Sequence, residues 1–287
     1  MKTTELFQTK TTFSFEVFPP KRTDSIDTIY RTLDKLQGLR PDFISVTYGA
    51  GGSANCTATL EIASAIKHKY KIESVAHLPG IGLTKADVLS QLRRFETAGI
   101  ENILALRGDI PSGSYFEGDF PHASDLISFI KEYADFNIIA ACYPEAHTES
   151  ENILSDIRHL KTKVDAGASQ LITQLFFDNN YFYRFRERCS LAGIHVPIEA
   201  GIMPVINKKQ IERMVTLCGV HLPKKFTAMM ERYENNPEAM RDAGIAYAID
   251  QIVDLNAQGV DGIHLYTMNN PYIAEKIYEA VHRLLAA

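Results

Sequence analysis

The sequence predicts an α/β fold, a (β/α)8 TIM barrel with extra short helices inserted between strands 7 and 8. Short β-like runs recur along the chain, amphipathic helical patterns lie between them, and a glycine often ends a helix just before the next strand. A parallel crossover takes a dozen or more residues, so strand and helix repeating at roughly thirty-residue intervals indicate parallel βα units. We expect a single domain over residues 1–287.

Eight β-like runs are the predicted strands, and eight βα units suggest a closed barrel. The runs cover residues 13–18, 43–46, 74–77, 102–106, 137–142, 170–174, 196–200 and 262–266.

Helical patterns with 3.6-residue spacing lie between these strands. The first consists of Ile26, Ile29, Tyr30, Leu33 and Leu36, and a later one of Ile153, Ile157, Leu160 and Val164. Thr148 and Glu151 form a capping-box signature for the later helix. Glycines suited to the left-handed position after a helix precede four of the strands, at Gly99, Gly167, Gly193 and Gly259.

The interval from Met203 to Gly259 is longer than the others. Its Pro223 and Pro237 predict an insertion of short helices rather than a second domain.

Composition places the chain among soluble globular proteins, with 45% hydrophobic and 23% charged residues. No apolar run approaches the ~20 residues of a membrane span, and the first twelve residues lack the order of a signal peptide, so we expect a cytoplasmic protein. The net charge of −5 without a basic block argues against nucleic acid or a membrane surface as partner. The widely spaced Cys56, Cys142, Cys189 and Cys218 indicate packing thiols rather than a metal or disulfide framework.

Glu16 stands out because it lies inside an apolar strand that Pro19 and Pro20 end. With a side-chain period of two, Phe13, Phe15 and Val17 share one face and Glu16 points to the other. Burial among phenylalanines would raise the pKa of the carboxyl, as a general acid requires. The alternative is an edge strand with a solvated polar face. In a barrel, Glu16 points into the lumen near the C-terminal mouth, where the sites of this architecture lie.

Polar residues gather at the predicted strand ends, which favours a ligand site over chance. They include Glu16, Thr47, His77, Arg107, Asp109, Tyr143, His147, Gln174, Tyr266 and Asn269. The run Gly49-Ala50-Gly51-Gly52 lacks the third glycine of a dinucleotide-binding fingerprint, so a loop whose backbone approaches a large ligand is the preferred interpretation.

Each of these residues also has a purely structural interpretation. His77 alone fits a core histidine, and Arg107 with Asp109 fits a surface ion pair. Lys163 fits a solvated lysine near the end of a helix, and Phe176 and Phe177 fit core positions.

Several motifs together resemble the methylenetetrahydrofolate reductase family over nearly the whole chain, most closely its short bacterial form. They are Phe15-Glu16-Val17-Phe18-Pro19-Pro20, Ser45-Val46-Thr47-Tyr48-Gly49-Ala50, Ala105-Leu106-Arg107-Gly108-Asp109, Tyr143-Pro144-Glu145, Lys163-Val164-Asp165-Ala166-Gly167-Ala168, Ile172-Thr173-Gln174-Leu175-Phe176-Phe177-Asp178 and Gly201-Ile202-Met203-Pro204-Val205.

The resemblance implies a barrel with non-covalent FAD and the reduction of 5,10-methylenetetrahydrofolate to 5-methyltetrahydrofolate by ping-pong transfer from NADH or NADPH, in the one-carbon metabolism that feeds methionine biosynthesis. By motif position Glu16 is the acid that protonates the folate, Asp109 stabilises the cationic iminium, and Gln174 bonds the substrate. We add Tyr266 to the substrate-binding set. Positions matching the FAD-binding residues of the family are Thr47, His77, Arg107, Gly108, Asp109, Ala123, Tyr143, His147, Asp156 and Lys163.

Two departures concern the folate tail. Lys208 stands where the family often has an aromatic residue, and Asn270 stands where it has the arginine that meets the glutamate carboxylate. We expect Lys208 to bind that carboxylate instead. His122 stands where some relatives carry a tyrosine over the flavin, and we leave it out of the cofactor set.

A flavin- or folate-binding subunit of a larger electron-transfer assembly is the alternative function. A proton donor and a cation stabiliser at one mouth, Glu16 and Asp109, favour the enzyme. A barrel aldolase or phosphosugar enzyme is disfavoured because no lysine lies at a strand end to form a Schiff base. The electron source, NADH, NADPH or a reduced protein, stays open, and we expect a homo-oligomer without a fixed subunit count.

Overall fold

Parallel strands alternate with helices throughout the computed structural model, which describes residues 1–20, 25–48, 53–109 and 118–286. The strands form one closed barrel in sequence order, and β1 pairs with β8 to complete it. They are β1 (Thr12–Val17), β2 (Phe43–Val46), β3 (Glu73–Pro79), β4 (Asn102–Leu106), β5 (Asn137–Cys142), β6 (Gln170–Thr173), β7 (Ile198–Ile202) and β8 (Gly262–Tyr266). The predicted (β/α)8 barrel is confirmed.

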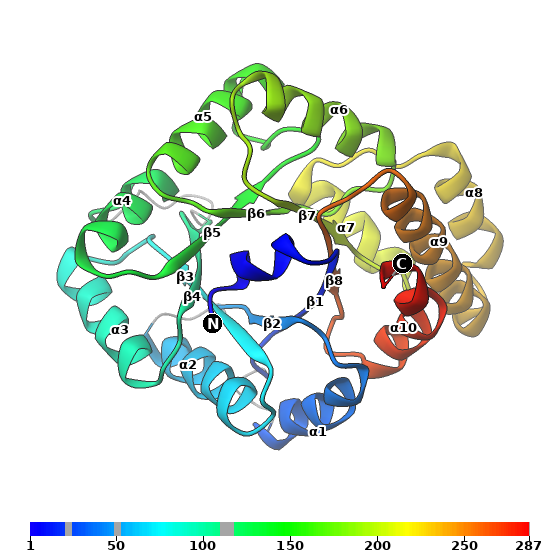
Figure 1. Cartoon of the computed structure of the whole chain (residues 1–287). Coiled ribbons are helices and arrows are strands. Elements are labelled where there is room, and N and C mark those ends of the chain that lie inside the picture. The colour runs from blue at the N-terminus through cyan, green and yellow to red at the C-terminus, as the bar shows by residue number, and fades with distance from the viewer. Residues whose placement is uncertain (21–24, 49–52, 110–117, 287) are drawn as a thin grey trace.

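Helices surround the barrel (Figure 1). They are α1 (Asp27–Leu36), α2 (Ser53–His68), α3 (Lys85–Thr97), α4 (Ala123–Tyr133), α5 (Ile153–Asp165), α6 (Asn179–Leu191), α7 (Lys208–Cys218), α8 (Lys224–Tyr233), α9 (Pro237–Ala257) and α10 (Pro271–Leu285), with the 3-10 helices η1 (Thr3–Gln8) and η2 (Gln37–Leu39). Helices α7, α8 and α9 lie between β7 and β8. With 21 residues, α9 is not one of the short helices that the sequence predicted.

The helices and strands begin and end largely where the capping and turn residues predict, with two corrections. The four helix-ending glycines have positive φ, as expected for left-handed positions. The cap of α5 is Asn152 rather than Thr148, because the Asn152 side chain accepts from the N–H groups of Leu154 and Ser155. The seventh strand begins at Ile198 rather than at residue 196, directly after Pro197, which has no N–H to donate to a ladder.

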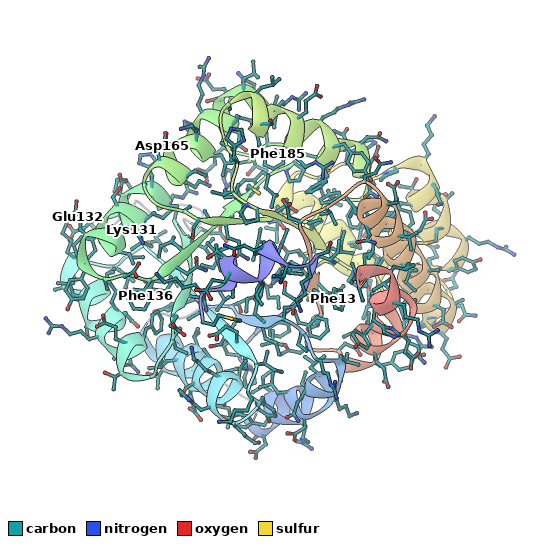
Figure 2. The ribbon with its side chains drawn as sticks, in the orientation of Figure 1. Phe13, Lys131, Glu132, Phe136, Asp165 and Phe185 are labelled. Carbon is teal, nitrogen blue, oxygen red and sulfur yellow. The ribbon has the colours of Figure 1, made fainter. Side chains whose placement is uncertain are left out.

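The two faces of β1 differ as its alternation predicts. Phe13, Phe15 and Val17 are buried in the main core between sheet and helices. Figure 2 shows Phe13 and Phe185 between strands and helices, whereas Glu132 is exposed on the outside. The other face of the sheet lines the lumen, where a small apolar cluster contains Phe43, Val75, Leu104, Ile139 and Ile172.

The N-terminal end of the barrel is closed by η1, which crosses the centre of the view in Figure 1. The Thr3 N–H donates to Asn102 Oδ1 at 2.9 Å, and the Thr3 hydroxyl donates to Gln170 Oε1 at 2.7 Å. Buried side-chain amides of the strands thereby obtain partners. A ligand therefore enters from the opposite, C-terminal end.

The inserted helices build a second apolar cluster against that C-terminal end. Phe177, which follows β6, stacks on Phe226 of α8 with ring centroids 4.4 Å apart. At Gly244 a Cβ atom would lie 1.6 Å from the Val205 carbonyl oxygen, so only glycine allows α9 to approach the chain after β7 so closely. The inserted helices thus pack directly against the residues that follow β6 and β7.

No helix in the described part of the chain combines the length and apolarity that crossing a membrane requires. Cys142 and Cys189 are buried free thiols, as the sequence suggested, and Cys218 is a half-buried free thiol.

Candidate functional site

A cavity of about 400 Å³ lies at the C-terminal mouth of the barrel. Apolar walls come from Leu104, Ile172, Met203, Met214 and Met268, to none of which the sequence had assigned a role in the site. Most of the predicted site residues line it as well: Glu16, Thr47, His77, Arg107, Gly108, Asp109, Tyr143, His147, Gln174 and Tyr266. The structure therefore brings together side chains from strands far apart in the sequence.

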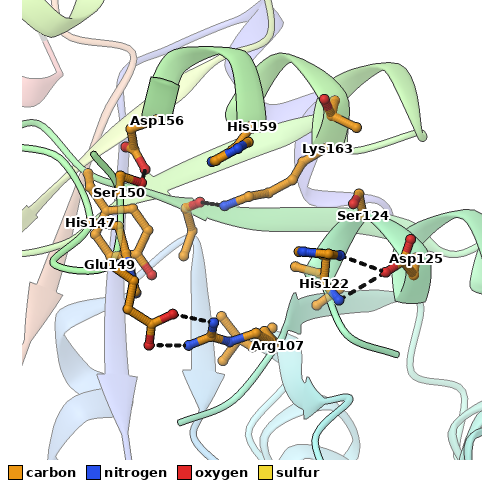
Figure 3. Close-up of a pocket in the computed structure, with 16 residues that line it drawn as sticks. Arg107, His122, Ser124, Asp125, His147, Glu149, Ser150, Asp156, His159 and Lys163 are labelled. Carbon is orange, nitrogen blue, oxygen red and sulfur yellow. Dashed lines mark hydrogen bonds and ion pairs between the residues drawn. The ribbon is translucent and has the colours of Figure 1, made fainter. Parts of the chain in front are cut away.

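A second cavity of about 570 Å³ adjoins the first and runs outward between α4 and α5 (Figure 3). The two cavities share the walls formed by Arg107, Tyr143 and His147. The predicted cofactor residues Ala123, Asp156 and Lys163 line the outer cavity. An elongated ligand with one end in the mouth and the other beside α5 fits this two-part shape.

The Glu16 carboxyl lies between two imidazoles. Its Oε2 is 3.6 Å from His77 Nε2 and 3.8 Å from His264 Nε2. Burial lowers the pKa of His77 to about 4, so this ring is neutral near pH 7. His77 Nε2 is buried and has no hydrogen-bond partner among the described residues, which leaves it for a ligand or for Glu16.

A chain of buried polar groups lies beneath Glu16. His264 Nδ1 is 2.7 Å from the Ser14 hydroxyl, which donates to Glu199 Oε1 at 3.0 Å. Glu199 also accepts from Thr12 and Gln170, and burial raises its pKa. When Ser14 donates to Glu199, His264 Nδ1 donates to Ser14, and its Nε2 faces Glu16 as an acceptor.

We did not single out His264 and Glu199 as functional from the sequence. The available signal was their inward direction on β8 and β7, the same alternation that identified Glu16 on β1.

Arg107 pairs with Glu149 rather than with Asp109, which corrects the surface pair considered above. Both terminal nitrogens of the guanidinium contact the Glu149 carboxylate, and the Nη2–Oε1 distance is 2.8 Å. The ion pair lowers the pKa of Glu149. Asp109 is left exposed at the mouth, without a cation of the described residues within ion-pair distance.

Lys163 is not a solvated lysine. Its ammonium donates to the Ala141 carbonyl at 2.9 Å and lies 5.6 Å from the centre of the Tyr143 ring. Burial lowers the pKa of this amine, because the charged form has lost water. An anion in the outer cavity would favour the charged form.

Gln174 and Tyr266 face the mouth in different ways. Gln174 Oε1 accepts from the Leu175 N–H at 2.9 Å, which leaves its amide nitrogen to donate to a ligand. The Tyr266 hydroxyl donates to the Thr173 carbonyl at 2.7 Å, and burial raises the pKa of this phenol. Tyr266 therefore offers its ring, not its hydroxyl, to a bound molecule.

Lys208 lies outside the mouth cavity. It forms an ion pair with Glu234 and lines a separate cavity of about 510 Å³ beside α7 and α9. A contact with a ligand in the mouth requires this ion pair to open. The predicted glycine loop, residues 49–52, lies outside the described residues. His122 lines the outer cavity, where its Nδ1 is 3.2 Å from Asp125.

Comparisons with known proteins match most of this chain. The family model described as methylenetetrahydrofolate reductase matches residues 2–282. A 5,10-methylenetetrahydrofolate reductase of Pectobacterium carotovorum subsp. carotovorum is 40% identical over 273 residues, which cover 94% of this chain and 89% of the relative. The enzyme named methylenetetrahydrofolate reductase (NADH) 1 of Arabidopsis thaliana is 39% identical over 277 residues, which cover 91% of this chain and 47% of the relative.

A solved structure of similar fold is that of an uncharacterized protein from Clostridium thermocellum that binds two copies of 5-methyl-5,6,7,8-tetrahydrofolic acid. Its TM-score is 0.63 at 14% sequence identity, with 98% of each chain covered. At this identity the likeness concerns the fold.

Proposed function

Since the chain belongs to the methylenetetrahydrofolate reductase family, we propose that it reduces 5,10-methylenetetrahydrofolate to 5-methyltetrahydrofolate with electrons from NADH or NADPH, using non-covalently bound FAD. The observation that carries the proposal is the placement of Glu16. Its carboxyl lies at the mouth of the barrel, between two imidazoles and in one cavity with Asp109 and Gln174.

Glu16 is the proton donor. Its proton goes to the nitrogen that closes the five-membered ring of the substrate, and the bond from that nitrogen to the one-carbon unit breaks. The one-carbon unit is left as a cationic iminium, which a hydride then reduces to a methyl group. A neutral His77 places no positive charge beside Glu16, so it does not favour the ionised carboxylate over the protonated acid.

Asp109 stabilises the positive charge that develops on the substrate. Its carboxylate lines the same cavity as Glu16 and has no ion-pair partner among the described residues. A fixed negative charge facing a developing cation lowers the barrier without reorganisation during the reaction. The amide nitrogen of Gln174 orients the substrate by donating to it.

The two-part cavity fits FAD. When bound, FAD would supply the hydride-transfer chemistry between the nicotinamide and the one-carbon unit. Arg107 and Lys163 are the cations that would hold its pyrophosphate, and the desolvation of the Lys163 ammonium, which donates to the Ala141 carbonyl, supports this. The remaining residues that would hold FAD are Thr47, His77, Gly108, Asp109, Ala123, Tyr143, His147 and Asp156.

Gly108 lines the mouth cavity, and its backbone packs closely against Ile81. Its φ is +90°, and an added Cβ atom would lie 2.4 Å from the Ile81 side chain. Glycine is therefore the residue that allows this turn between Arg107 and Asp109.

The experiment is anaerobic absorption spectroscopy of the purified protein. Flavin bands should bleach with NADH, NADPH or both, and 5,10-methylenetetrahydrofolate should restore them with formation of 5-methyltetrahydrofolate. Protein without flavin bands that also binds no added FAD would contradict the proposal. Bands that bleach but are not restored by the folate would instead support the electron-transfer subunit.

A further inference from the structure

We propose that Thr267 and Asn269, in the loop between β8 and α10, are positioning residues that hold the end of β1 and thereby aim the Glu16 carboxyl. The proposal rests on the proposed function, in which Glu16 delivers a proton to the folate. Neither residue is assigned a role by the proposal above.

The backbone ladder between β1 and β8 ends at the pair formed by Glu16 and Tyr266. Beyond that pair, side chains take over its role. The Thr267 hydroxyl donates to the Glu16 carbonyl at 2.6 Å. Asn269 Oδ1 accepts from the Phe18 N–H at 3.0 Å, and Asn269 Nδ2 donates to the Phe18 carbonyl at 2.8 Å. One amide side chain thus bonds both backbone groups of Phe18, as a paired strand would.

This substitute is needed because the chain cannot continue as a strand. Pro19 and Pro20 follow Phe18, and neither has an N–H to donate. On the other side of β1, the Thr47 N–H donates to the Val17 carbonyl at 3.0 Å. The carbonyls of Glu16, Val17 and Phe18 are therefore each hydrogen-bonded, two of them by the loop after β8.

The loop adopts an uncommon backbone conformation to make these contacts. Met268 and Asn269 have φ of 51° and 54°, in the left-handed region that is unfavourable for residues other than glycine. Asparagine tolerates this region better than most residues do. Thr267 is buried, and its hydroxyl also accepts from the Asn269 N–H at 3.2 Å, so the two positioning residues support each other. Strained backbone of this kind gathers at functional sites.

The consequence for Glu16 follows from its short distances to the neighbouring imidazoles, 3.6 and 3.8 Å. A shift of the strand end would move the carboxyl relative to both rings and to a substrate in the mouth. Misplacement of a reacting group by about 1 Å costs on the order of 10²-fold in rate. The loss should appear only in the step that uses the proton.

The test compares two reactions of the holoenzyme. NAD(P)H oxidation with a quinone as artificial acceptor needs no acid, whereas reoxidation of the reduced enzyme by 5,10-methylenetetrahydrofolate does. Thr267→Val and Asn269→Ala should slow the folate reaction at least tenfold and leave the quinone reaction within about twofold. Thr267→Ser retains the hydroxyl and should restore the folate reaction.

Asn269→Gly separates the amide contacts from the backbone conformation. Glycine accepts the left-handed φ but has no amide, so this variant should be as slow with folate as Asn269→Ala. Hydrogen exchange supplies a readout that does not depend on activity. The Phe18 amide should lose protection in Asn269→Ala and Asn269→Gly, and retain it in Asn269→Asp, which keeps the acceptor oxygen.

Equal losses in both reactions would overturn the proposal, because they would indicate a general structural role. Loss of Phe18 protection with an unchanged folate reaction would overturn it too. If Asn269→Ala does not fold, Asn269→Gly decides in the same way. Failure of the proposed function is distinguishable, since wild-type protein would then lack the folate reaction itself.

Discussion

His77 and His264 both lie close to the Glu16 carboxyl, and burial suppresses the protonation of His77. The His77 Nε2 has no hydrogen-bond partner in the described part of the chain, and its pKa of about 4 makes it a neutral ring beside an acid. A cationic imidazole there would favour ionised Glu16 and so oppose proton donation. The neutral ring adds no such positive charge beside Glu16.

The buried His77 also makes the free energy of unfolding depend on pH. Its pKa falls from 6.5 in the unfolded chain to about 4 in the fold, so the unfolded state binds more protons between these values. Stability contributed by the neutral ring is therefore present above pH 6.5 and is lost as the pH falls toward 4. The expected loss is about 3 kcal/mol, from 1.36 kcal/mol per unit.

Urea denaturation of wild type and His77→Gln at several pH values between these limits tests this prediction. At each pH, the free energy of unfolding of the variant is subtracted from that of wild type. This difference cancels the contributions of groups that do not interact with His77, including Glu199. The variant should lose less stability on acidification than wild type does. Parallel pH dependence of the two proteins would contradict the assignment.

The direction of Glu16 was predictable from the sequence, but its neighbours were not. An alternation of period two places Glu16 opposite Phe15 and Val17 without further information. Its contact with His264 depends on the pairing of β1 with β8, which joins the two ends of the chain. Local pattern does not specify that register, and no position near Glu16 in the sequence points to residue 264.

Helix α5 shows how an element supplies a binding surface. Asp156 and Lys163 are seven residues apart, so they lie on the same face of the helix, and both line the outer cavity. Asp156 accepts from the Ser150 hydroxyl at 2.9 Å, while Lys163 donates to β5 at the Ala141 carbonyl. We expect the lysine to bind the pyrophosphate of FAD.

Lys163→Ala should weaken FAD binding about tenfold or more, as expected for loss of a charged hydrogen bond in a desolvated place. Lys161→Ala is the matched control, since Lys161 lies on the same helix and pairs with Asp165 on the surface. Titration of the apoprotein with FAD, followed by flavin fluorescence, measures both. Equal affinities of the two variants would mean that Lys163 has only a structural contact with β5.

The start of helix α7 bears on how the glutamate tail of the folate is bound. Lys208 at its start was predicted to bind the tail carboxylate, yet the structure pairs it with Glu234 in a cavity apart from the mouth. If the ion pair opens for the tail, Lys208→Ala should weaken folate binding severalfold, and Glu234→Gln should strengthen it by freeing the ammonium. Nicotinamide oxidation should not change.

Folate titrations of both variants distinguish the two cases. Opposite changes in affinity would support the tail contact, whereas unchanged affinity in both would restrict Lys208 to its ion pair on the surface. Position in the sequence suggested the contact because β7 and β8 are neighbours. It did not reveal Glu234, which the insertion between these strands brings to Lys208.

Element boundaries were predictable where local chemistry decides them. The glycines that follow helices were predictable because a left-handed φ favours glycine, and all four have a positive φ. The predicted cap of α5, Thr148, was wrong. Thr148 and Asn152 both precede the helix, and only the nearer side chain, that of Asn152, reaches its free N–H groups. Such competition between neighbouring caps is settled by the path of the loop.

At the scale of the whole molecule, the barrel has one closed end and one open end. Thr3 of η1 is bonded to strand side chains at the N-terminal end, and the cavity with Glu16 lies at the other. Repetition of βα units predicted this architecture, because eight parallel strands leave few alternatives to closure. The outer cavity was less predictable, since it depends on the packing of α4 against α5.

A single mouth of about 400 Å³ should admit the nicotinamide and the folate in turn. We therefore expect initial-rate plots against one substrate, at several concentrations of the other, to give parallel lines. High concentrations of either substrate should inhibit competitively with the other. Intersecting lines together with a demonstrated ternary complex would show that both substrates fit at once.

The most direct test of the account is the Glu16→Gln variant, studied one half-reaction at a time. The variant keeps the shape of the side chain but has no proton to donate. It should fold, bind FAD and oxidise NAD(P)H at a rate close to wild type, while reoxidation by 5,10-methylenetetrahydrofolate slows by about 10² to 10⁴-fold. A folate rate within tenfold of wild type, or an equal loss in both half-reactions, would contradict the claim that Glu16 is the proton donor.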